Sequence, residues 1–269
     1  MPEGPEVKSM IDQLNSIVKN KLLNSITINS GRYSKKTPDY FNDFTKNLPS
    51  KLSSVNCKGK FIYLEFENGW KIWNTLGMTG GWKKNQTKHS HLTFEFNNIT
   101  LYFEDMRNFG TFKFNNSITD FNKKIKSLGT DIFEEDFTLE YVTNILKTKK
   151  YQKKTIVDIL MNQKLFCGVG NYLKAEILYS CKISPHRLVE DLTVSDIKNI
   201  YTNTKKISYI SYKHGGASVR DYSNLDHKDG EYTNFLKVYG QKKDPLGNTV
   251  KREETSDKRT THWVPEIQK

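Results

Sequence analysis

The sequence predicts an α+β protein of two domains, in which an N-terminal helix and an antiparallel β-sandwich precede a helical domain that ends in a β-hairpin. Three observations lead to this prediction. Apolar residues recur at helical spacing near the N-terminus, alternate with a period of two between residues 25 and 114, and return to helical spacing after residue 116. With 269 residues, the chain is long enough for two domains of ordinary size.

The change of pattern also indicates where the domains meet. A glycine-containing acidic stretch at 128–136 separates the strand-rich half from the helical half. We therefore expect an N-terminal domain at 1–132, a hinge at 133–137 and a C-terminal domain at 138–269, whose hairpin spans about 237–269.

The first helix is predicted from the apolar residues of one face, which are spaced by four, three and four positions: Val7, Ile11, Leu14 and Val18. We expect this helix to run from about Pro5 to Leu22. Pro5 suits the first helical position, and Glu6 suits the first turn, where the helix dipole favours a carboxylate.

Stretches of alternating apolar residues predict β-strands at 25–29, 60–66, 69–73, 91–96, 99–103 and 111–114. The Glu-Asn-Gly sequence at 67–69 and the Asn pair at 97–98 are typical of hairpin turns. Antiparallel strands at this spacing form a sandwich or a barrel. The first helix has to pack against it, which would carry the N-terminal amine to an edge of the sheet.

The second half is predicted to contain helices at 155–162, at 172–179 and from about 194 to 212. Gly168 and Gly170 allow a tight turn before the middle helix, and Asn171 is a natural N-cap for it. The free N–H groups at that end could bind an anion, with Lys164 on the other side of the turn. An ordinary αα-hairpin would also explain the glycines.

The C-terminal residues alternate weakly at 249–253 and 259–264, which predicts a β-hairpin. This hairpin contains no cysteine, which excludes a zinc ribbon built on cysteine ligands. We expect its single histidine, His262, to be a surface residue rather than a metal ligand.

The composition favours a polyanionic partner and a reducing compartment. The formal net charge is +12 and the isoelectric point is about 9.3, which is typical of nucleic-acid-binding proteins, although a Lys- and Asn-rich composition also follows from genome base bias. The three cysteines are isolated, which argues against a disulfide framework. We see no apolar run of membrane-spanning length and no secretory leader. We therefore expect an intracellular protein, in the nucleus or wherever the genome is replicated.

Two loops contain side chains suited to a DNA wedge. Met78 lies in the stretch Gly-Met-Thr-Gly at 77–80, an unusual place for a core residue. Arg107 and Phe109 are two positions apart at a strand junction, where alternation would place them on the same side. Proteins insert such side chains into a base stack when they extrude a nucleotide. Each one alone is better explained by packing or by a turn.

The first residues can supply a nucleophile. Methionine before proline is readily removed, so the mature chain would begin with the secondary amine of Pro2, followed by the carboxylate of Glu3. Such an amine can attack a sugar carbon and form an iminium, while Glu3 could transfer protons. A flexible N-terminus before an ordinary helix is the better explanation of these residues alone. Lys60, at the start of a predicted strand, could reach a phosphate or be a solvated strand end.

Taken in order, the motifs of the chain resemble those of the formamidopyrimidine-DNA glycosylase and endonuclease VIII family. They are Pro-Glu-Gly-Pro-Glu at 2–6, Lys60, Leu-Gly-Met-Thr-Gly at 76–80, Asp-x-Arg-x-Phe-Gly at 105–110, residues 163–171, Val-Tyr-Gly at 238–240 and Arg259. Each motif is weak alone, whereas their ordered combination is specific and runs from end to end. Residues 168–179, and the short segment between Gly216 and Tyr239, are most similar to the endonuclease VIII-like 1 branch.

The resemblance also implies the roles of individual residues. Pro2 would be the nucleophile at the sugar C1′, and Glu3 the acid and base on the deoxyribose. Lys60 would take part in catalysis and would also bind phosphate, together with Lys164, Asn171 and Arg259, while Met78, Arg107 and Phe109 would fill the void left by the extruded base. The family's C-terminal finger usually holds zinc through four cysteines, which are absent here. The resemblance therefore implies a zincless finger, with no metal or other cofactor. Asn108 replaces an arginine common in the family, and we expect this change to matter little.

The expected function is that of a bifunctional DNA glycosylase and AP lyase of base excision repair. It would remove oxidised bases, mainly pyrimidines and hydantoins, through a Schiff base on Pro2 and β,δ-elimination. The expected partner is damaged double-stranded DNA, and single-stranded DNA is a possible second partner. We expect the positive charge to draw the DNA into a cleft between the two halves. We expect the protein to be a monomer and not to bind a membrane. The alternatives are a glycosylase that prefers 8-oxoguanine and formamidopyrimidines, and a non-catalytic DNA- or RNA-binding protein on the same scaffold.

Overall fold

The computed structural model describes residues 1–218 and 223–269, which form two compact units. Unit 1 consists of Met1–Lys126 and Gly215–Glu231, and unit 2 of Ser127–His214 and Tyr232–Lys269. The domain limits expected from the sequence are continuous, whereas these units are not. The segment Gly215–Glu231, expected in the second domain, belongs to the same compact unit as the N-terminal residues.

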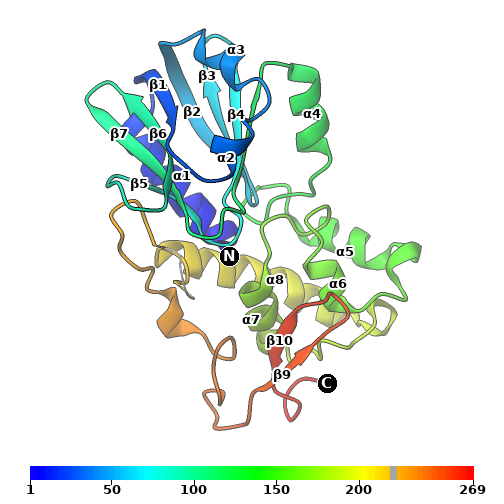
Figure 1. Cartoon of the computed structure of the whole chain (residues 1–269). Helices are drawn as coiled ribbons and strands as arrows, with labels where there is room; N and C mark the ends of the chain where they lie inside the picture. The colour runs from blue at the N-terminus through cyan, green and yellow to red at the C-terminus, as the bar shows by residue number, and fades with distance from the viewer. Residues whose placement is uncertain (219–222) are drawn as a thin grey trace. The chain divides into compact units, whose positions relative to one another are not determined.

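The described residues of unit 1 form helix α1 (Gly4–Val18) and an eight-stranded antiparallel sheet in the order β5-β7-β6-β1-β2-β3-β4-β8 (Figure 1). The strands are β1 (Leu22–Ile28), β2 (Ser50–Lys58), β3 (Phe61–Phe66), β4 (Lys71–Thr75), β5 (Gly80–Lys83), β6 (Ser90–Phe96), β7 (Ile99–Asp105) and β8 (Thr111–Asn115). Short helices complete the unit: α2 (Arg32–Lys35), α3 (Phe41–Thr45) and α4 (Ile118–Lys126). β1 and β2 pair at their first residues, Leu22 with Lys51 and Leu23 with Ser50, and so join two halves of the sheet.

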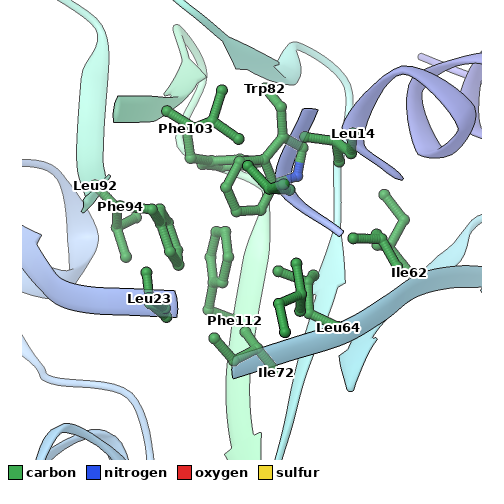
Figure 2. Packing of buried hydrophobic residues seen from close by; sticks show 14 of the residues in the cluster. Leu14, Leu23, Ile62, Leu64, Ile72, Trp82, Leu92, Phe94, Phe103 and Phe112 are labelled. Carbon is green, nitrogen blue, oxygen red and sulfur yellow. The ribbon is translucent and has the colours of Figure 1, made fainter. Parts of the chain in front are cut away.

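The core of unit 1 lies between these two halves, which gives the expected sandwich (Figure 2). Phe112 of β8 contacts rings from three strands of the other half, with centroids 5.9, 5.8 and 4.7 Å away: Trp82, Phe94 and Phe103. Trp82 is fully buried, and its Nε1 donates a hydrogen bond to Oδ1 of Asn74 at 3.1 Å. Such an aromatic cluster stabilises the unit because it removes a large apolar area from water.

Helix α1 packs its apolar face into the same core. Its buried residues include those predicted from their spacing: Val7, Ile11, Leu14 and Val18. The helix ends at Val18 rather than at Leu22, because Asn20 has left-handed backbone (φ 64°) and Leu22 opens β1. The first turn of α1, which directly follows Pro2 and Glu3, is thereby fixed to the sandwich.

Two strands were missed by the sequence analysis, for different physical reasons. In β2 a register shift between Leu52 and Ser54 interrupts the alternation, so that the buried residues Leu52 and Val55 are three positions apart. β5 is four residues long and begins with Gly80 and Gly81, and glycine is depleted in strands. The predicted strands are all present, with ends displaced by a few residues.

Unit 2 is helical and ends in a hairpin. Its described elements are α5 (Leu139–Lys147), η1 (Lys149–Tyr151), α6 (Ile156–Leu160), α7 (Asn171–Cys181), η2 (Val189–Asp191), α8 (Val194–Lys213), η3 (Tyr232–Phe235), β9 (Lys251–Glu254) and β10 (Thr260–Trp263). β9 and β10 pair antiparallel, which confirms the predicted hairpin. α7 is buried along nearly its whole length, so it forms the centre of the unit rather than one of its faces. No helix among the described residues is long and apolar enough to cross a membrane.

Two details of unit 2 differ from the sequence-based expectation. The N-cap of α7 is Gly170, so Asn171 is the first residue of the helix and not its cap. His262 is buried, with 9% of its surface exposed, because β10 places its ring 4.8 Å from that of Tyr239. The expectation that His262 lies at the surface is therefore wrong.

Candidate active site

Pro2 and Glu3 directly precede α1, whose first residue is Gly4. Residues 2–6 are buried, whereas Met1 is 56% exposed. Pro5 is the second residue of the helix rather than the first, still within the turn where its missing N–H costs no hydrogen bond. The structure therefore holds Pro2 and Glu3 together at the positive end of α1, where negative charge is stabilised.

A buried carboxylate, that of Glu6, fixes this end of the helix. Its Oε2 accepts a hydrogen bond from the N–H of Glu3, and its Oε1 accepts one from the N–H of Ala217, both at 2.7 Å. Glu6 is 1% exposed. The neighbouring Gly216 has a φ of +86°, and a Cβ there would lie 2.5 Å from Cγ of Glu6. The sequence indicated Glu6 only as an acidic residue of the first helical turn, because no sequence pattern predicts a hydrogen-bond donor at residue 217.

The carboxylate of Asp105 joins the two loops that carry the predicted wedge. Asp105 is 1% exposed; its Oδ1 accepts a hydrogen bond from the Thr79 hydroxyl at 2.5 Å, and its Oδ2 accepts from the N–H of Gly110 at 2.6 Å. The Thr79 hydroxyl in turn accepts from the N–H of Arg107 at 2.9 Å. The sequence motif gave Asp105 no role; in the structure its carboxylate connects the loop that contains Thr79 to the loop that contains Arg107 and Gly110.

The predicted wedge residues lie on these two adjoining loops. The guanidinium carbon of Arg107 is 4.9 Å from the ring centroid of Phe109, which is 50% exposed. Met78 is half-buried. The preceding Gly77 (φ +63°) is packed so closely that a Cβ would lie 2.7 Å from the backbone of Phe109. The structure thus gathers Met78, Arg107 and Phe109 in one part of unit 1.

Asn108 has a structural role in the same loop that the sequence did not indicate. Its backbone is left-handed, with a φ of 58°, which asparagine tolerates better than most residues. Its Oδ1 accepts a hydrogen bond from the N–H of Arg32 at 3.2 Å. An arginine, which has no acceptor, could not make this contact.

Lys60 lies in the turn between β2 and β3, one residue before β3 begins, and is half-buried. The turn passes through Gly59, whose φ is +56°. Lys60 belongs to unit 1, together with Pro2. The other residues expected to bind phosphates belong to unit 2: Lys164, Asn171 and Arg259.

The turn between α6 and α7 is organised by the side chain of Gln163. Its Nε2 donates to the carbonyl of Val169 at 2.8 Å, and its Oε1 accepts from the N–H of Gly168 at 3.1 Å. Gly168 has a φ of +106°, a backbone conformation that favours glycine. Lys164 is exposed on this rigid turn.

Asn171 touches the hairpin turn that carries Arg259. Nδ2 of Asn171 donates a hydrogen bond to the carbonyl of Thr260, the residue after Arg259, at 2.9 Å. Arg259 itself is exposed where the turn ends and β10 begins. Two of the residues expected to bind phosphates, Asn171 and Arg259, are therefore held close together within unit 2.

Two titratable side chains of the hairpin have shifted pKa values. Burial would raise the pKa of Glu253, but hydrogen bonds from Lys251, His186 and Trp263 outweigh it and lower the pKa to about 2. Burial lowers the pKa of His262 to about 4, so its ring is neutral near neutral pH. Among the residues that the structure describes, no cluster of three or more His, Cys, Asp or Glu could hold a metal ion. The zinc that the fingers of other family members usually hold does not fit this donor set.

Comparison with family models covers most of the chain. The formamidopyrimidine-DNA glycosylase N-terminal domain matches residues 1–112, the H2TH domain of that family matches 128–223, and its C-terminal domain matches 223–269. A formamidopyrimidine-DNA glycosylase of Listeria monocytogenes is 32% identical, with 100% of both chains covered. That of Carboxydothermus hydrogenoformans is 28% identical, also with 100% of both covered.

Solved structures give the same result. The MutM (Fpg) protein of Thermus thermophilus matches with a TM-score of 0.88 at 26% identity, over 99% of this chain and 98% of that chain. The Lactococcus lactis Fpg in complex with DNA containing an abasic site matches with a TM-score of 0.88 at 26% identity, over 99% of both.

A sandwich with a proline near its N-terminus, a glycine-rich turn between two helices and a C-terminal hairpin together define a DNA glycosylase of base excision repair. The chain belongs to the formamidopyrimidine-DNA glycosylase family. The family expected from the motifs is thereby confirmed. The narrower similarity to the endonuclease VIII-like 1 branch stays a prediction.

Proposed function

We propose that the protein is a bifunctional DNA glycosylase and AP lyase in which Pro2, made N-terminal by removal of Met1, is the nucleophile. The nitrogen of Pro2 bonds to C1′ of the damaged nucleotide, and the base leaves with the electron pair of the glycosidic bond and takes up a proton. Opening of the sugar ring, with loss of the proton from the Pro2 nitrogen, leaves an iminium. Removal of a proton from C2′ then expels the 3′ phosphate, a second elimination expels the 5′ phosphate, and water hydrolyses the iminium.

The observation that carries this proposal is the fixed position of residues 2–6 at the start of a buried helix. Glu6 binds the N–H of Glu3, so the residue after Pro2 is tied to α1. An α-amino group titrates near pH ~8, so that at pH ~7 part of it is neutral and nucleophilic without special tuning. The carboxylate of Glu3, next to Pro2, is suited to transfer protons at the deoxyribose.

The remaining residues suit the binding of DNA with an extruded nucleotide. Donors for backbone phosphates come from both units: Lys60, Lys164, Asn171 and Arg259. Met78 and Phe109 offer apolar groups to the space that an extruded base vacates, and Arg107 adds a cation beside them. Phe109 is half exposed while it contacts Arg107, and exposed aromatic rings of this kind can stack on a neighbouring base.

We further propose oxidised pyrimidines and hydantoins as the preferred lesions. The support is the short segment between Gly216 and Tyr239, where the resemblance implies a longer base-capping loop in oxidised-guanine specialists; residues 219–222 lie outside the described residues. The alternative, a preference for formamidopyrimidine lesions, is favoured by the names of the relatives and by a Lactococcus lactis Fpg variant, 27% identical, in complex with Fapy-dG containing DNA. Initial rates on thymine glycol, dihydrouracil, 8-oxoguanine and formamidopyrimidine duplexes distinguish the two.

Borohydride trapping tests the nucleophile. The protein, incubated with a duplex containing an abasic site and then reduced, should give a covalent adduct that peptide mass locates on Pro2. Pro2→Gly should abolish base removal and trapping while it leaves DNA binding largely intact. If the N-terminus is confirmed as proline and DNA binds without any adduct, the chain is a DNA-binding member of the family without this chemistry.

A further inference from the structure

The hairpin turn that carries Arg259 contains a buried ion pair. Nζ of Lys174, on α7, lies 2.6 Å from Oδ2 of Asp257, in the turn between β9 and β10. The side chains are 0% and 4% exposed, respectively. A buried ammonium or carboxylate is costly unless it is paired and hydrogen-bonded, so each of these two side chains constrains the position of the other.

The same carboxylate also orders the turn itself. Oδ1 of Asp257 accepts a hydrogen bond from the Thr255 hydroxyl at 2.5 Å. The N–H of Thr255 donates to the carbonyl of Arg259 at 3.1 Å, and its hydroxyl lies 2.7 Å from that of Thr261. Asp257 therefore links α7 on one side to the backbone of Arg259 on the other.

Two further contacts attach this hairpin turn to the start of α6 and the start of α7. The Ser256 hydroxyl is 2.6 Å from that of Thr155, the N-cap of α6. The carbonyl of Thr260 accepts from Asn171, the first residue of α7. Arg259 thus lies between attachment points at residues 256 and 257 on one side and 260 on the other. Of these attachments, the pair of Lys174 and Asp257 is the one that is both ionic and buried.

We propose that Lys174 is a positioning residue for DNA binding: through Asp257 it holds the hairpin turn so that Arg259 and Asn171 bind backbone phosphates as one preformed group. The proposal rests on the phosphate-binding role proposed above for these two residues. It also gives the hairpin a cross-link of its own, in a part of the chain whose described residues contain no cluster that could hold a metal ion. Lys174 lies three residues after Asn171 on α7, so the cross-link and the phosphate ligand share one rigid helix.

The experiment is a mutant cycle between Lys174 and Arg259, read by the affinity for a duplex with an uncleavable abasic-site analogue. Lys174→Met should weaken binding by about tenfold, comparable with Arg259→Ala, because a charge-assisted hydrogen bond to phosphate is lost in both. In the Arg259→Ala background, Lys174→Met should then cost little more. Lys174→Arg, which keeps the ion pair, should bind close to the wild type.

The matched control is Lys198→Met, which removes the same charge from an exposed position on α8. It should weaken binding only slightly, as expected for a change in net charge. Circular dichroism and thermal unfolding establish that each variant is folded at the assay temperature. If Lys174→Met does not fold, Asp257→Asn replaces it, since asparagine keeps the oxygen that accepts from Thr255.

The proposal is overturned if folded Lys174→Met binds DNA like the wild type, or if its loss of affinity is as large without Arg259 as with it. The second outcome would leave the ion pair a purely structural feature. Borohydride trapping of the wild type is scored separately. An absent adduct would remove the proposed chemistry, whereas the coupling between Lys174 and Arg259 in DNA affinity could still be present.

Discussion

Two regions of this protein that carry proposed site residues each contain a buried carboxylate, but the carboxylates have different partners. At the start of α1, Glu6 accepts hydrogen bonds from two backbone N–H groups, those of Glu3 and Ala217. In the hairpin, Asp257 binds the ammonium group of Lys174. Both carboxylates are almost inaccessible to solvent, so each has to be satisfied inside the protein.

The difference determines how each region can be disrupted. A backbone N–H cannot be removed by changing the side chain that carries it, so these two hydrogen bonds respond to backbone geometry and to changes in Glu6 itself. An ion pair can be broken from either side, and the partner left behind is then a buried, uncompensated charge. The N-terminal region should therefore be sensitive to glycine substitutions, and the hairpin to charge.

Among the changes that test this comparison, Gly216→Ala should have the largest effect. The new Cβ would lie 2.5 Å from Glu6 at a φ of +86°, so the loop or the carboxylate has to move. Overpacking costs about 1–3 kcal/mol, and a displacement of about 1 Å near reacting groups can cost ~100-fold in rate. Single-turnover base release should fall by about that factor. Gly69→Ala is the control, because Gly69 has a φ of +85° but no atom within 4 Å of the added group.

An unchanged rate in folded Gly216→Ala would show that the contact with Glu6 does not govern the position of Pro2. Loss of rate in the Gly69→Ala control as well would instead point to general destabilisation by left-handed alanine. Thermal unfolding of both variants separates the two explanations.

Glu6→Gln should have a smaller effect in the same direction. An amide keeps one acceptor oxygen, so either Glu3 or Ala217 loses its hydrogen-bond partner, at a cost of about 1–3 kcal/mol. Trapping with borohydride should slow by about tenfold, while DNA affinity stays near that of the wild type. The exposed Glu67, changed to Gln, serves as the control. Wild-type trapping kinetics in Glu6→Gln would contradict the positioning role of Glu6.

Acid should destabilise the hairpin region through two groups. The pKa of His262 is lowered by burial from 6.5 to about 4, so the unfolded chain binds more protons between these values and stability falls as the pH drops from 6.5 to 4. The pKa of Glu253, held at about 2 against an ordinary 4.5, adds a further loss as the pH drops from 4.5 to 2. The midpoint temperature of thermal unfolding, measured at a series of pH values from 7 to 2, reports both losses of stability.

Replacement of His262 by Gln should flatten the upper part of this profile, and Glu253→Gln the lower part. A His262→Gln profile as steep as that of the wild type between pH 6.5 and pH 4 would mean that other groups cause the loss.

The smallest effect should be that of a chelator. We expect EDTA to leave the unfolding midpoint and the affinity for DNA unchanged, because ion pairs and hydrogen bonds hold the hairpin. A lower midpoint in EDTA, restored by added zinc, would show that a metal contributes after all.

The sequence was most informative where one local pattern decided the structure. Alternation located most strands, and the spacing of apolar residues located α1 and its buried face. Alternation did not predict β2, because a register shift interrupts the period of two, or β5, because two of its four residues are glycines. His262 was misplaced because weak alternation in a hairpin does not say which face is covered.

Within the candidate site, motifs indicated residues but not what holds them. The roles of Pro2 and Glu3 and of the two wedge loops stay predictions, drawn from the first residues of the chain, from loop composition and from the family resemblance. The partners of Glu6 and Lys174 could not be predicted, because Ala217 contributes only a backbone N–H and Asp257 lies in an unremarkable polar turn. Contacts that span so much sequence leave no periodic signal.

The discontinuity of unit 1 has a consequence for the way the protein is made. Pro2 and Glu6 leave the ribosome first, but Ala217, which donates a second hydrogen bond to Glu6, emerges only after the first segment of unit 2, Ser127–His214, has been synthesised. The nascent N-terminal half therefore waits with an incompletely bonded carboxylate, since domains otherwise fold as they emerge. Translation that stops before residue 217 yields a sandwich without this contact, so partial chains would lack the finished support of residues 2–6.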